Sequence, residues 1–276
     1  MSLALLYLSR KKNSGIENLE KFIRSYKKIC HGYDHQLYVL LKGYNLKEID
    51  SISVELKSLK AKKIILEDLN YDLGSYFYAS KQINEKFVCF LNTESKLIID
   101  NWLYIMMKQI NTKNISMIGT TASFETHAFR LPYFDLSVSG FFYFFGRVLF
   151  RFINRFYNNF YFKKFPNPHI RTNGFIVNRK IFLDYIKKVG IPNNKFDTLK
   201  IESGNKSLTS HIISLDNDAY IVGKNAVSYR VNQWPISSTF CINDQKNVLI
   251  NDKQIESYAS HSLVAKKRIE YDVWSL

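Results

Sequence analysis

Cysteine, glycine and proline are all scarce in this sequence. Its three cysteines, Cys30, Cys89 and Cys241, stand far apart, and none is spaced as a zinc ligand or as half of a redox pair. This excludes a disulfide scaffold and a cysteine metal site, and we expect three reduced thiols. With 11 glycines and 5 prolines among 276 residues, the chain also lacks flexible linkers, so we expect one compact domain.

Long apolar runs and the common nucleotide fingerprints are missing as well. No stretch reaches about 18 uncharged apolar residues, so we expect no membrane-spanning helix. Residues 1–8 are apolar but too few for a signal peptide, and their basic neighbours follow them instead of preceding them. The patterns GxGxxG, GxxxxGKS/T, GxSxG and HExxH do not occur, which argues against dinucleotide oxidoreductases, P-loop enzymes, α/β-hydrolases and zinc proteases of the common types.

Apolar runs of strand length alternate with helical patterns. The first half predicts strands at residues 3–8, 37–41, 63–66, 87–91 and 115–118, with helices at 16–30, 76–82 and 102–110. The second half predicts strands at residues 173–178 and 220–222, with helices at 181–189 and 207–215. This alternation predicts an α/β protein with a mostly parallel central sheet flanked by helices. Ligands of such sheets bind at the carboxyl ends of the strands.

Polar residues follow three of these predicted strands. They are Ser9 and Arg10 after the first, Asn70, Tyr71, Asp72 and Gly74 after the third, and Asn92, Thr93, Glu94 and Ser95 after the fourth. This order, with a D-x-G segment leading into a helix and F-L-N-x-acid-S after the fourth strand, resembles nucleotide-sugar glycosyltransferases of the GT-A fold, near the family 2 type. The resemblance implies a GT-A, Rossmann-like fold, here with an aromatic and basic helical insert and a C-terminal extension.

Two further stretches resemble a little-characterised bacterial group of such enzymes. Residues 165–175 read FPNPHIRTNGF, and residues 202–209 read ESGNKSLT. The resemblance implies a single domain over residues 1–276. Its expected parts are a nucleotide-sugar-binding half (residues 1–125), an acceptor-side half (residues 126–230) with an insert at residues 137–165, and a C-terminal extension (residues 231–276).

The resemblance also implies roles for individual residues. Glu202 stands where the family has its catalytic base, which implies an inverting transfer in which the carboxylate takes the proton of the attacking hydroxyl. The implied donor-binding residues are Ser9, Arg10, Tyr71, Asp72, Gly74, Asn92, Thr93 and Glu94. The implied acceptor-binding residues are Glu125, His127, His169, Arg171 and Asn173.

In the family, the fourth strand ends in Asp-x-Asp, whose carboxylates hold a divalent metal against the donor diphosphate. Here the corresponding residues are Asn92 and Glu94. Mg²⁺ and Mn²⁺ prefer hard oxygen ligands, and one carboxylate with one amide is a poorer site than two carboxylates. If a metal ion binds, Asn92 and Glu94 are its candidate ligands. The replacement of Asp-x-Asp by these residues argues against a strict requirement for the metal. The cations that could replace the ion are Arg10, Lys96 and Arg171.

Each assignment has a structural alternative. Glu202 could be an acid near a helix N-terminus, where the helix dipole stabilises it without any catalysis. Residues 92–94 could form an ordinary strand-end turn, and Asp72 could belong to a common Asp-x-Gly turn. His169 and Arg171 could lie on an exposed loop that meets no ligand.

Positive charge is concentrated in one part of the chain. The net charge is +15, and residues 136–200 hold 12 basic and 2 acidic residues, which gives +10. Within them, residues 141–164 are rich in aromatics, and Arg147, Arg151 and Arg155 stand four apart, which predicts a basic stripe along a helix. We expect this helix to contact an anionic membrane surface or a lipid-linked acceptor. A packed helix with snorkelling arginines and a nucleic-acid contact are the alternatives.

Together these features favour an enzyme of polysaccharide biosynthesis for the cell envelope. We expect a glycosyltransferase that moves a sugar from a UDP-, GDP- or dTDP-sugar to a saccharide or lipid-linked surface-glycan acceptor. We expect it to be cytoplasmic and peripheral to the inner face of the cell membrane. The alternatives are an inactive GT-A-like scaffold, a basic module that binds nucleic acid or membranes, and a nucleotidyltransferase. Nucleic acid is the less favoured partner, because no predicted strand has the aromatic pattern of an RNA-recognition motif.

Overall fold

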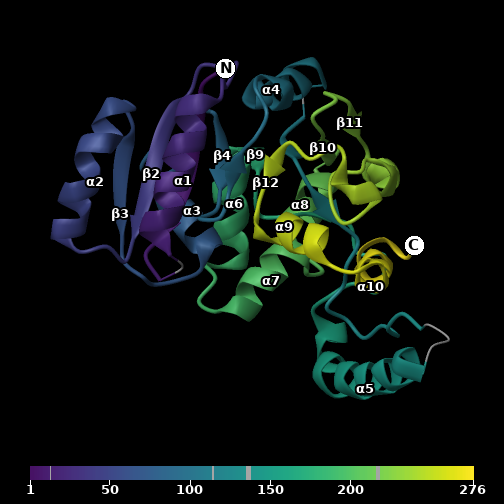
Figure 1. The fold of residues 1–276 in the computed structure, drawn as a ribbon. Helices are drawn as coiled ribbons and strands as arrows, with labels where there is room; N and C mark the ends of the chain where they lie inside the picture. Colours follow the sequence, from purple (N-terminus) through teal and green to yellow (C-terminus); the bar gives the residue numbers. More distant parts are fainter. Residues whose placement is uncertain (13, 114, 135–137, 216–217) are drawn as a thin grey trace.

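The computed structural model describes residues 1–12, 14–113, 115–134, 138–215 and 218–276 (Figure 1). The strands of its central sheet are β1 (Leu3–Arg10), β2 (Gln36–Lys42), β3 (Lys62–Leu66), β4 (Phe87–Leu91), β6 (Met117–Gly119), β9 (Phe175–Asn178), β10 (Tyr220–Val222) and β11 (Ser228–Tyr229). Their order across the sheet is β11-β10-β6-β9-β4-β1-β2-β3. Neighbours run parallel, except that β9 is antiparallel to β4 and β6, and β11 is antiparallel to β10.

Helices cover both faces of this sheet. Their bounds are α1 (Gly15–Lys28), α2 (Leu46–Ser58), α3 (Asp72–Lys81), α4 (Trp102–Lys113), α5 (Val138–Arg155), α6 (Arg179–Val189), α7 (Lys195–Ser203), α8 (Leu208–Ser214), α9 (Lys253–Ser260) and α10 (Leu263–Trp274). Short 3-10 helices are η1 (Tyr157–Phe160), η2 (Val231–Ile236) and η3 (Asn243–Gln245). Helices α1, α2 and α4 share one hydrophobic core with the sheet, and α3, α6 and α8 share the core on the opposite face.

The residues of β1 alternate between these two cores. Leu5 and Tyr7 pack with α1, α2 and α4, whereas Leu6 and Leu8 pack with α3 and α6. The Tyr7 ring stacks on Phe22 of α1 with 3.8 Å between centroids. Successive side chains of a strand point to opposite faces, so a central strand covered on both sides must be apolar throughout. This is why an unbroken apolar run marked the strand in the sequence.

The predicted α/β class with a mostly parallel central sheet flanked by helices is confirmed. The five strands predicted in the first half are β1, β2, β3, β4 and β6. Helix α3, however, begins at Asp72, so Asp72 and Gly74 belong to its first turn and the separate Asp-x-Gly turn is wrong. Helix α2 was not predicted, although it starts with a capping box in which Asn45 and Glu48 bond each other's backbone N–H groups.

The C-terminal extension lies against the carboxyl ends of the central strands. Strand β12 (Ile250–Asn251) pairs antiparallel with β5 (Lys96–Leu97), which comes shortly after β4. A second small sheet pairs β7 (Ala122–Ser123) with β8 (His169–Ile170). Helix α9 follows β12 directly, and its N-terminal end contacts the loops that follow β4 and β8, through the pairs of Lys253 with Glu94 and of Asp252 with Arg171.

Helix α5 lies apart from the sheet, beside α10 (Figure 1). Its Arg151 is only 1% exposed, and Nη2 of this residue lies 2.5 Å from Oδ2 of Asp272 on α10. Arg151 Nη1 also donates to the carbonyl of Arg130 over 3.2 Å. The predicted outward basic stripe is therefore wrong at Arg151, because a distant acid turns this arginine toward the body of the protein. The side chain of Arg155 lies outside the described residues.

Apolar side chains cover the outward side of α5 instead. Six of them are more than half exposed: Phe142, Phe145, Leu149, Phe150, Phe152 and Ile153. Most recur at intervals of three and four residues, which places them on one face of the helix. In the described part of the chain, no helix combines the length and the apolar character needed to cross a membrane.

Candidate active site at the strand ends

Strand β1 ends in an arginine that two neighbouring loops hold in place. Arg10 donates its backbone N–H to Oγ1 of Thr93 over 3.2 Å, and its Nε lies 2.9 Å from Oδ1 of Asp68 in the loop after β3. The Arg10 guanidinium also lies 5.8 Å from the ring centroid of Tyr71. The predicted donor residues Arg10, Tyr71 and Thr93 therefore meet at one edge of the sheet.

Ser9 and Gly74 pack beside this edge. The buried Ser9 hydroxyl donates to the carbonyl of Gly15 over 3.2 Å and lies 2.6 Å from the Tyr44 hydroxyl. A Cβ added to Gly74 would stand 2.7 Å from Cβ of Asn70, so the glycine lets the loop after β3 approach α3. The structure thus gives both residues a packing role, and their predicted contact with a donor remains a prediction.

Asp72 is a half-buried carboxylate between cations and other acids. Burial raises its pKa, and the nearby charges of Lys42 and Arg10 oppose this rise. The carboxylates of Glu202 and Glu94 raise the pKa of Asp72 further. Burial also lowers the pKa of Lys42, the last residue of β2. Charged side chains from four other parts of the sequence, Lys42, Arg10, Glu202 and Glu94, thus act on Asp72.

The segment that replaces Asp-x-Asp forms a tight turn after β4. Asn92 Oδ1 accepts a hydrogen bond from the N–H of Glu94 and lies 3.0 Å from Ser95 Oγ. Asn173 Oδ1 in turn accepts from the N–H of Asn92 over 3.1 Å. Glu94 Oε1 lies 3.7 Å from Nζ of Lys253 on α9. The Asn92 side chain is therefore engaged in hydrogen bonds of the strand-end turn, whereas the Glu94 carboxylate is partly exposed.

These residues do not fit a divalent cation. The amide oxygen of Asn92 is taken by hydrogen bonds within the turn, and Glu94 supplies one carboxylate beside the cationic Lys253. In the described part of the chain, no three His, Cys, Asp or Glu side chains gather as a metal site. Metal binding at Asn92 and Glu94 would require the turn to open.

A charged cleft of about 470 Å³ lies beside Glu94 and the start of α1. Four lysines and three glutamates line it: Lys12, Lys21, Lys96, Lys253, Glu17, Glu94 and Glu256. Lys96 Nζ lies 2.5 Å from Oε1 of Glu256, and Lys12 Nζ lies 2.7 Å from Oδ2 of Asp68. Lysine ammonium groups bind phosphate well, and the expected cation Lys96 is among those that border this cleft.

Glu202 lies in the last turn of α7, where one of its carboxylate oxygens is fixed. Oε1 accepts hydrogen bonds from the backbone N–H and from Oγ1 of Thr172, over 2.9 and 3.1 Å. The alternative of an acid near a helix N-terminus is wrong, because a carboxylate at a helix C-terminus is opposed by the dipole. Thr172 stabilises the charge in place of the helix.

His169 lies near Glu202 and is only 7% exposed. Its Nδ1 donates to the carbonyl of Asn167 over 2.9 Å, which leaves Nε2 as the acceptor of the neutral ring. Burial lowers the pKa of His169, and the Glu202 carboxylate partly opposes this. Arg171 is likewise 8% exposed, so the alternative of an exposed loop is wrong for both residues.

Arg171 and Asn173 bind the first turn of α9. Arg171 Nη2 lies 3.0 Å from Oδ2 of Asp252 and donates to Oε1 of Gln254 over 2.6 Å. Asn173 Nδ2 donates to the same oxygen of Asp252 over 3.0 Å. Burial alone would raise the pKa of Asp252, but the Arg171 cation and these hydrogen bonds hold it below its usual value. Arg171 is thus engaged in an almost fully buried ion pair, whereas the paired lysines of the charged cleft, Lys12, Lys96 and Lys253, are partly or largely exposed.

Glu125 and His127 lie in the segment between β7 and α5. The backbone N–H of Glu125 donates to Oγ of Ser123 over 2.9 Å. The His127 ring meets Phe162 edge to face, with 5.1 Å between centroids. Both residues therefore stand on the side of the molecule that leads to α5, and their contact with an acceptor remains a prediction.

Three residues of the site were missed in the sequence. Lys42 ends β2 as Arg10 ends β1, so its strand-end position was a usable signal. Asp252 accepts a hydrogen bond from the N–H of Ile255 and caps α9, but its pairing with Arg171 spans 81 positions and leaves no local pattern. Thr172 lies inside the FPNPHIRTN stretch, yet its bond to Glu202 depends on the folded path of α7.

No protein-family model matches this sequence, and no curated protein matches it. Among solved structures, S. aureus TarS 1–349 in complex with UDP-GlcNAc is 16% identical with a TM-score of 0.35, over 44% of this chain and 34% of that chain. The apo-form glycosyltransferase GlyE of Streptococcus pneumoniae TIGR4 is 11% identical with a TM-score of 0.40, over 79% of this chain and 45% of that chain.

A synthase structure is similar at the same level. The 4-diphosphocytidyl-2C-methyl-D-erythritol synthase from Anaerococcus prevotii DSM 20548 is 11% identical with a TM-score of 0.44, over 80% of this chain and 86% of that chain. The match to TarS spans about a third of the TarS chain. At these identities and TM-scores the similarities concern the fold at most, and they carry no weight for the activity.

Proposed function

We propose that this protein is a glycosyltransferase that uses a nucleotide-sugar donor bound at the carboxyl ends of β1, β3 and β4. The observation that carries the proposal is that Arg10 contacts Thr93 and Tyr71 at the strand ends, where the charges of Arg10, Lys42, Glu94 and Glu202 act on the half-buried Asp72. These residues come from five separate segments and converge where ligands of parallel sheets bind. Burial and nearby charges shift the pKa values of Asp72 and Lys42, and such shifted groups are typical of functional sites.

The charged cleft beside Glu94 is the proposed site of the donor diphosphate. Its lysines supply positive charge without a metal ion, and the N-terminus of α1 adds the partial charge of its backbone N–H groups. Asp72 is proposed to meet the nucleoside. The proposed donor is therefore a UDP-, GDP- or dTDP-sugar, and its binding would not require Mg²⁺ or Mn²⁺.

Glu202 is the proposed catalytic base. An acceptor hydroxyl would attack the anomeric carbon, the bond from that carbon to the diphosphate oxygen would break, and the nucleoside diphosphate would leave with the bonding electrons. The proton of the hydroxyl would pass to the Glu202 carboxylate, giving an inverted product. Thr172 fixes one oxygen of this carboxylate, which orients the other. His169 and Asn173 are proposed to border the acceptor.

The outward face of α5 is the proposed contact with a membrane. Its exposed aromatic and aliphatic side chains would enter the lipid interface, and the exposed Lys163 and Lys164 follow the helix. Arg151 contributes by fixing α5 on α10, since it is paired with Asp272. This arrangement suits an acceptor linked to a lipid, at the inner face of the cell membrane.

A Glu202→Gln variant tests the proposed reaction. We expect transfer from the preferred nucleotide sugar to fall by about a hundredfold or more, because a base of this kind contributes that much. The affinity for the nucleotide should not change, since Glu202 does not border the charged cleft. Glu20→Gln, an exposed change on α1, is the matched control. Normal turnover in Glu202→Gln would eliminate Glu202 as the base.

A further inference from the structure

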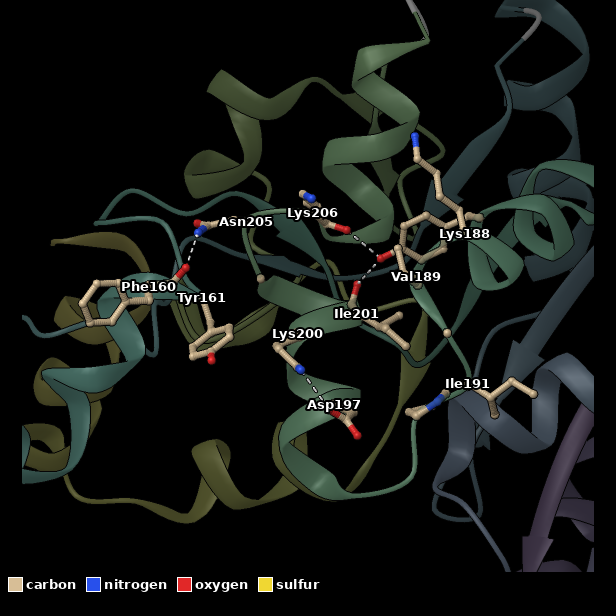
Figure 2. Close-up of a pocket in the computed structure, with 14 residues that line it drawn as sticks. Phe160, Tyr161, Lys188, Val189, Ile191, Asp197, Lys200, Ile201, Asn205 and Lys206 are labelled. Carbon is tan, nitrogen blue, oxygen red and sulfur yellow. Dashed lines mark hydrogen bonds and ion pairs between the residues drawn. The ribbon is translucent and has the colours of Figure 1, made fainter.

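A second cavity lies away from the strand ends. It has a volume of about 610 Å³ and is enclosed by the ends of α6 and η1 and by one side of α7 (Figure 2). Asp197, Lys200 and Ile201 of α7 line it. At about 100° per residue, Glu202 points to the opposite side of this helix, where it bonds Thr172. The cavity is therefore separated from the proposed reaction site by the body of α7.

The cavity has an excess of positive charge. Lys188, Lys200 and Lys206 line it, with Asp197 as the acid among the lining residues. Asp197 Oδ1 lies 2.9 Å from Nζ of Lys200, so this pair is neutral (Figure 2). Within the described residues, no carboxylate lies within ion-pair distance of Lys188 or Lys206. Lys188 and Lys206 are exposed at the rim of the cavity, and the Lys188 side chain leads away from it in Figure 2. Because lysine side chains are long and flexible, both ammonium groups can turn toward an anion in the cavity.

The floor and one wall of the cavity are apolar. Val189, Ile191 and Pro192 form the aliphatic part, and Phe160 and Tyr161 form the aromatic part. The Asn205 side chain bonds the carbonyl of Phe160 over 3.1 Å, which fixes this wall against the end of α7 (Figure 2). The Phe160 side chain borders the cavity and is 73% exposed.

We propose that this cavity binds a phosphate or diphosphate group. Lys188 and Lys206 would hold the anion as point charges, and the adjoining rings and aliphatic side chains would contact the group that carries it. The apolar side chains that line the cavity and the exposed Phe160 ring favour a phosphorylated lipid as the source, while a free phosphate compound is the other source of the same chemistry. The proposal does not depend on sugar transfer, because no residue of the donor cleft lines this cavity.

The test is a titration with inorganic diphosphate and with farnesyl diphosphate, followed by backbone amide NMR of the whole chain. We expect the amides of Gly190 and Asn205, which border the cavity, to shift with both probes. A Lys188→Gln/Lys206→Gln variant should weaken this binding by about tenfold or more, since it removes two charge-assisted bonds. The control Lys180→Gln/Lys187→Gln removes two charges from exposed positions of α6 and should bind as the wild type does.

The two probes separate the two sources. Tighter binding of farnesyl diphosphate identifies a lipid phosphate, and equal affinities identify a free phosphate compound. The proposal is overturned if neither amide shifts, or if the Lys188→Gln/Lys206→Gln variant binds as tightly as the control. Amide shifts confined to the loops around Arg10 and Glu94 would also overturn it, and they would be consistent with the proposed donor site.

Discussion

The Arg171 guanidinium and the Asp252 carboxylate form an ion pair over 3.0 Å that joins the loop after β8 to the first turn of α9. Both side chains are almost fully buried, with 10% and 3% exposed. Asn173 donates to the same carboxylate and also accepts from the backbone of Asn92. Asp252 therefore positions, through Asn173, the turn at Asn92 to Ser95 that borders the charged cleft.

Replacing Asp252 with asparagine should strongly destabilise the fold. The change leaves the Arg171 charge buried without its partner, and breaking a buried pair in this way costs about 3–5 kcal/mol of unfolding free energy. Urea denaturation followed by circular dichroism would measure the loss. The control is Asp184→Asn, whose carboxylate is 57% exposed and 3.8 Å from Lys187. This control should change stability by no more than about 0.5 kcal/mol.

The same variant carries a pH signature. The pKa of Asp252 is lowered in the folded state, so its stabilisation is present above the unfolded pKa and is lost as the pH falls through the folded pKa. The stability gap between wild type and Asp252→Asn should therefore narrow in acid. A gap that stays constant down to acid pH would contradict the ion pair.

Asp72 should show the opposite pH dependence. Its pKa is raised, mainly by burial, so the folded state favours the protonated carboxyl. The stability linked to this group is present below the unfolded pKa and is lost as the pH rises through the folded pKa. Relative to wild type, Asp72→Asn should therefore gain stability as the pH rises from acid to neutral.

Thermal or urea unfolding at several pH values measures this difference. Asp50→Asn, on the exposed side of α2, should show no such trend. If the wild type instead gained stability relative to Asp72→Asn as the pH rises, the nearby cations would outweigh the effect of burial on the pKa of Asp72.

Thr172→Val should slow the proposed transfer without weakening donor binding. The change removes the Oγ1 bond to Glu202 and leaves the backbone N–H bond in place. A hydrogen bond to a charged group contributes about 1.5–3 kcal/mol, so we expect kcat to fall about tenfold or more. Thr172→Ser keeps the hydroxyl and should restore most of the rate. Equal rates in the valine and serine variants would show that the hydroxyl does not position Glu202.

Membrane binding should depend on the apolar face of α5 more than on Arg147. Leu149 and Ile153 are 62% and 68% exposed, and burial of each side chain in lipid contributes about 1.5–3 kcal/mol. Leu149→Ser/Ile153→Ser should therefore release the protein from anionic vesicles in a flotation assay. Arg147→Gln should remain bound. If Arg147→Gln were released from the vesicles while the serine variant stayed bound, the basic stripe and not the apolar face would make the membrane contact.

The sequence predicted what is local and missed what depends on distant pairing. The runs at β1, β2 and β4 were recognised because strands covered on both faces are apolar throughout. The spacing of Arg147 and Arg151 predicted a helix correctly, but not its orientation, because the partner Asp272 lies 121 positions from Arg151. Helical spacing shows which residues share a face, and only the tertiary fold decides where that face points.

The candidate site divides in the same way. Arg10, Asp72 and Glu94 were accessible as polar residues after apolar strands, and Glu202 through its motif. The packing role of Gly74 and the capping of the turn by Asn92 depend on backbone paths that a strand-end pattern does not reveal. The lysines of the charged cleft come from four separate segments, so no single stretch of sequence marks them as a group.

The most direct test of the proposed donor site is calorimetric titration of the protein with UDP, GDP, CDP and dTDP, each with and without Mn²⁺. The proposal predicts that one of the four nucleotides binds with micromolar affinity, that Mn²⁺ leaves this affinity unchanged, and that Lys253→Gln weakens it. Absence of binding by all four, with and without Mn²⁺, would contradict a nucleotide-sugar donor at the strand ends.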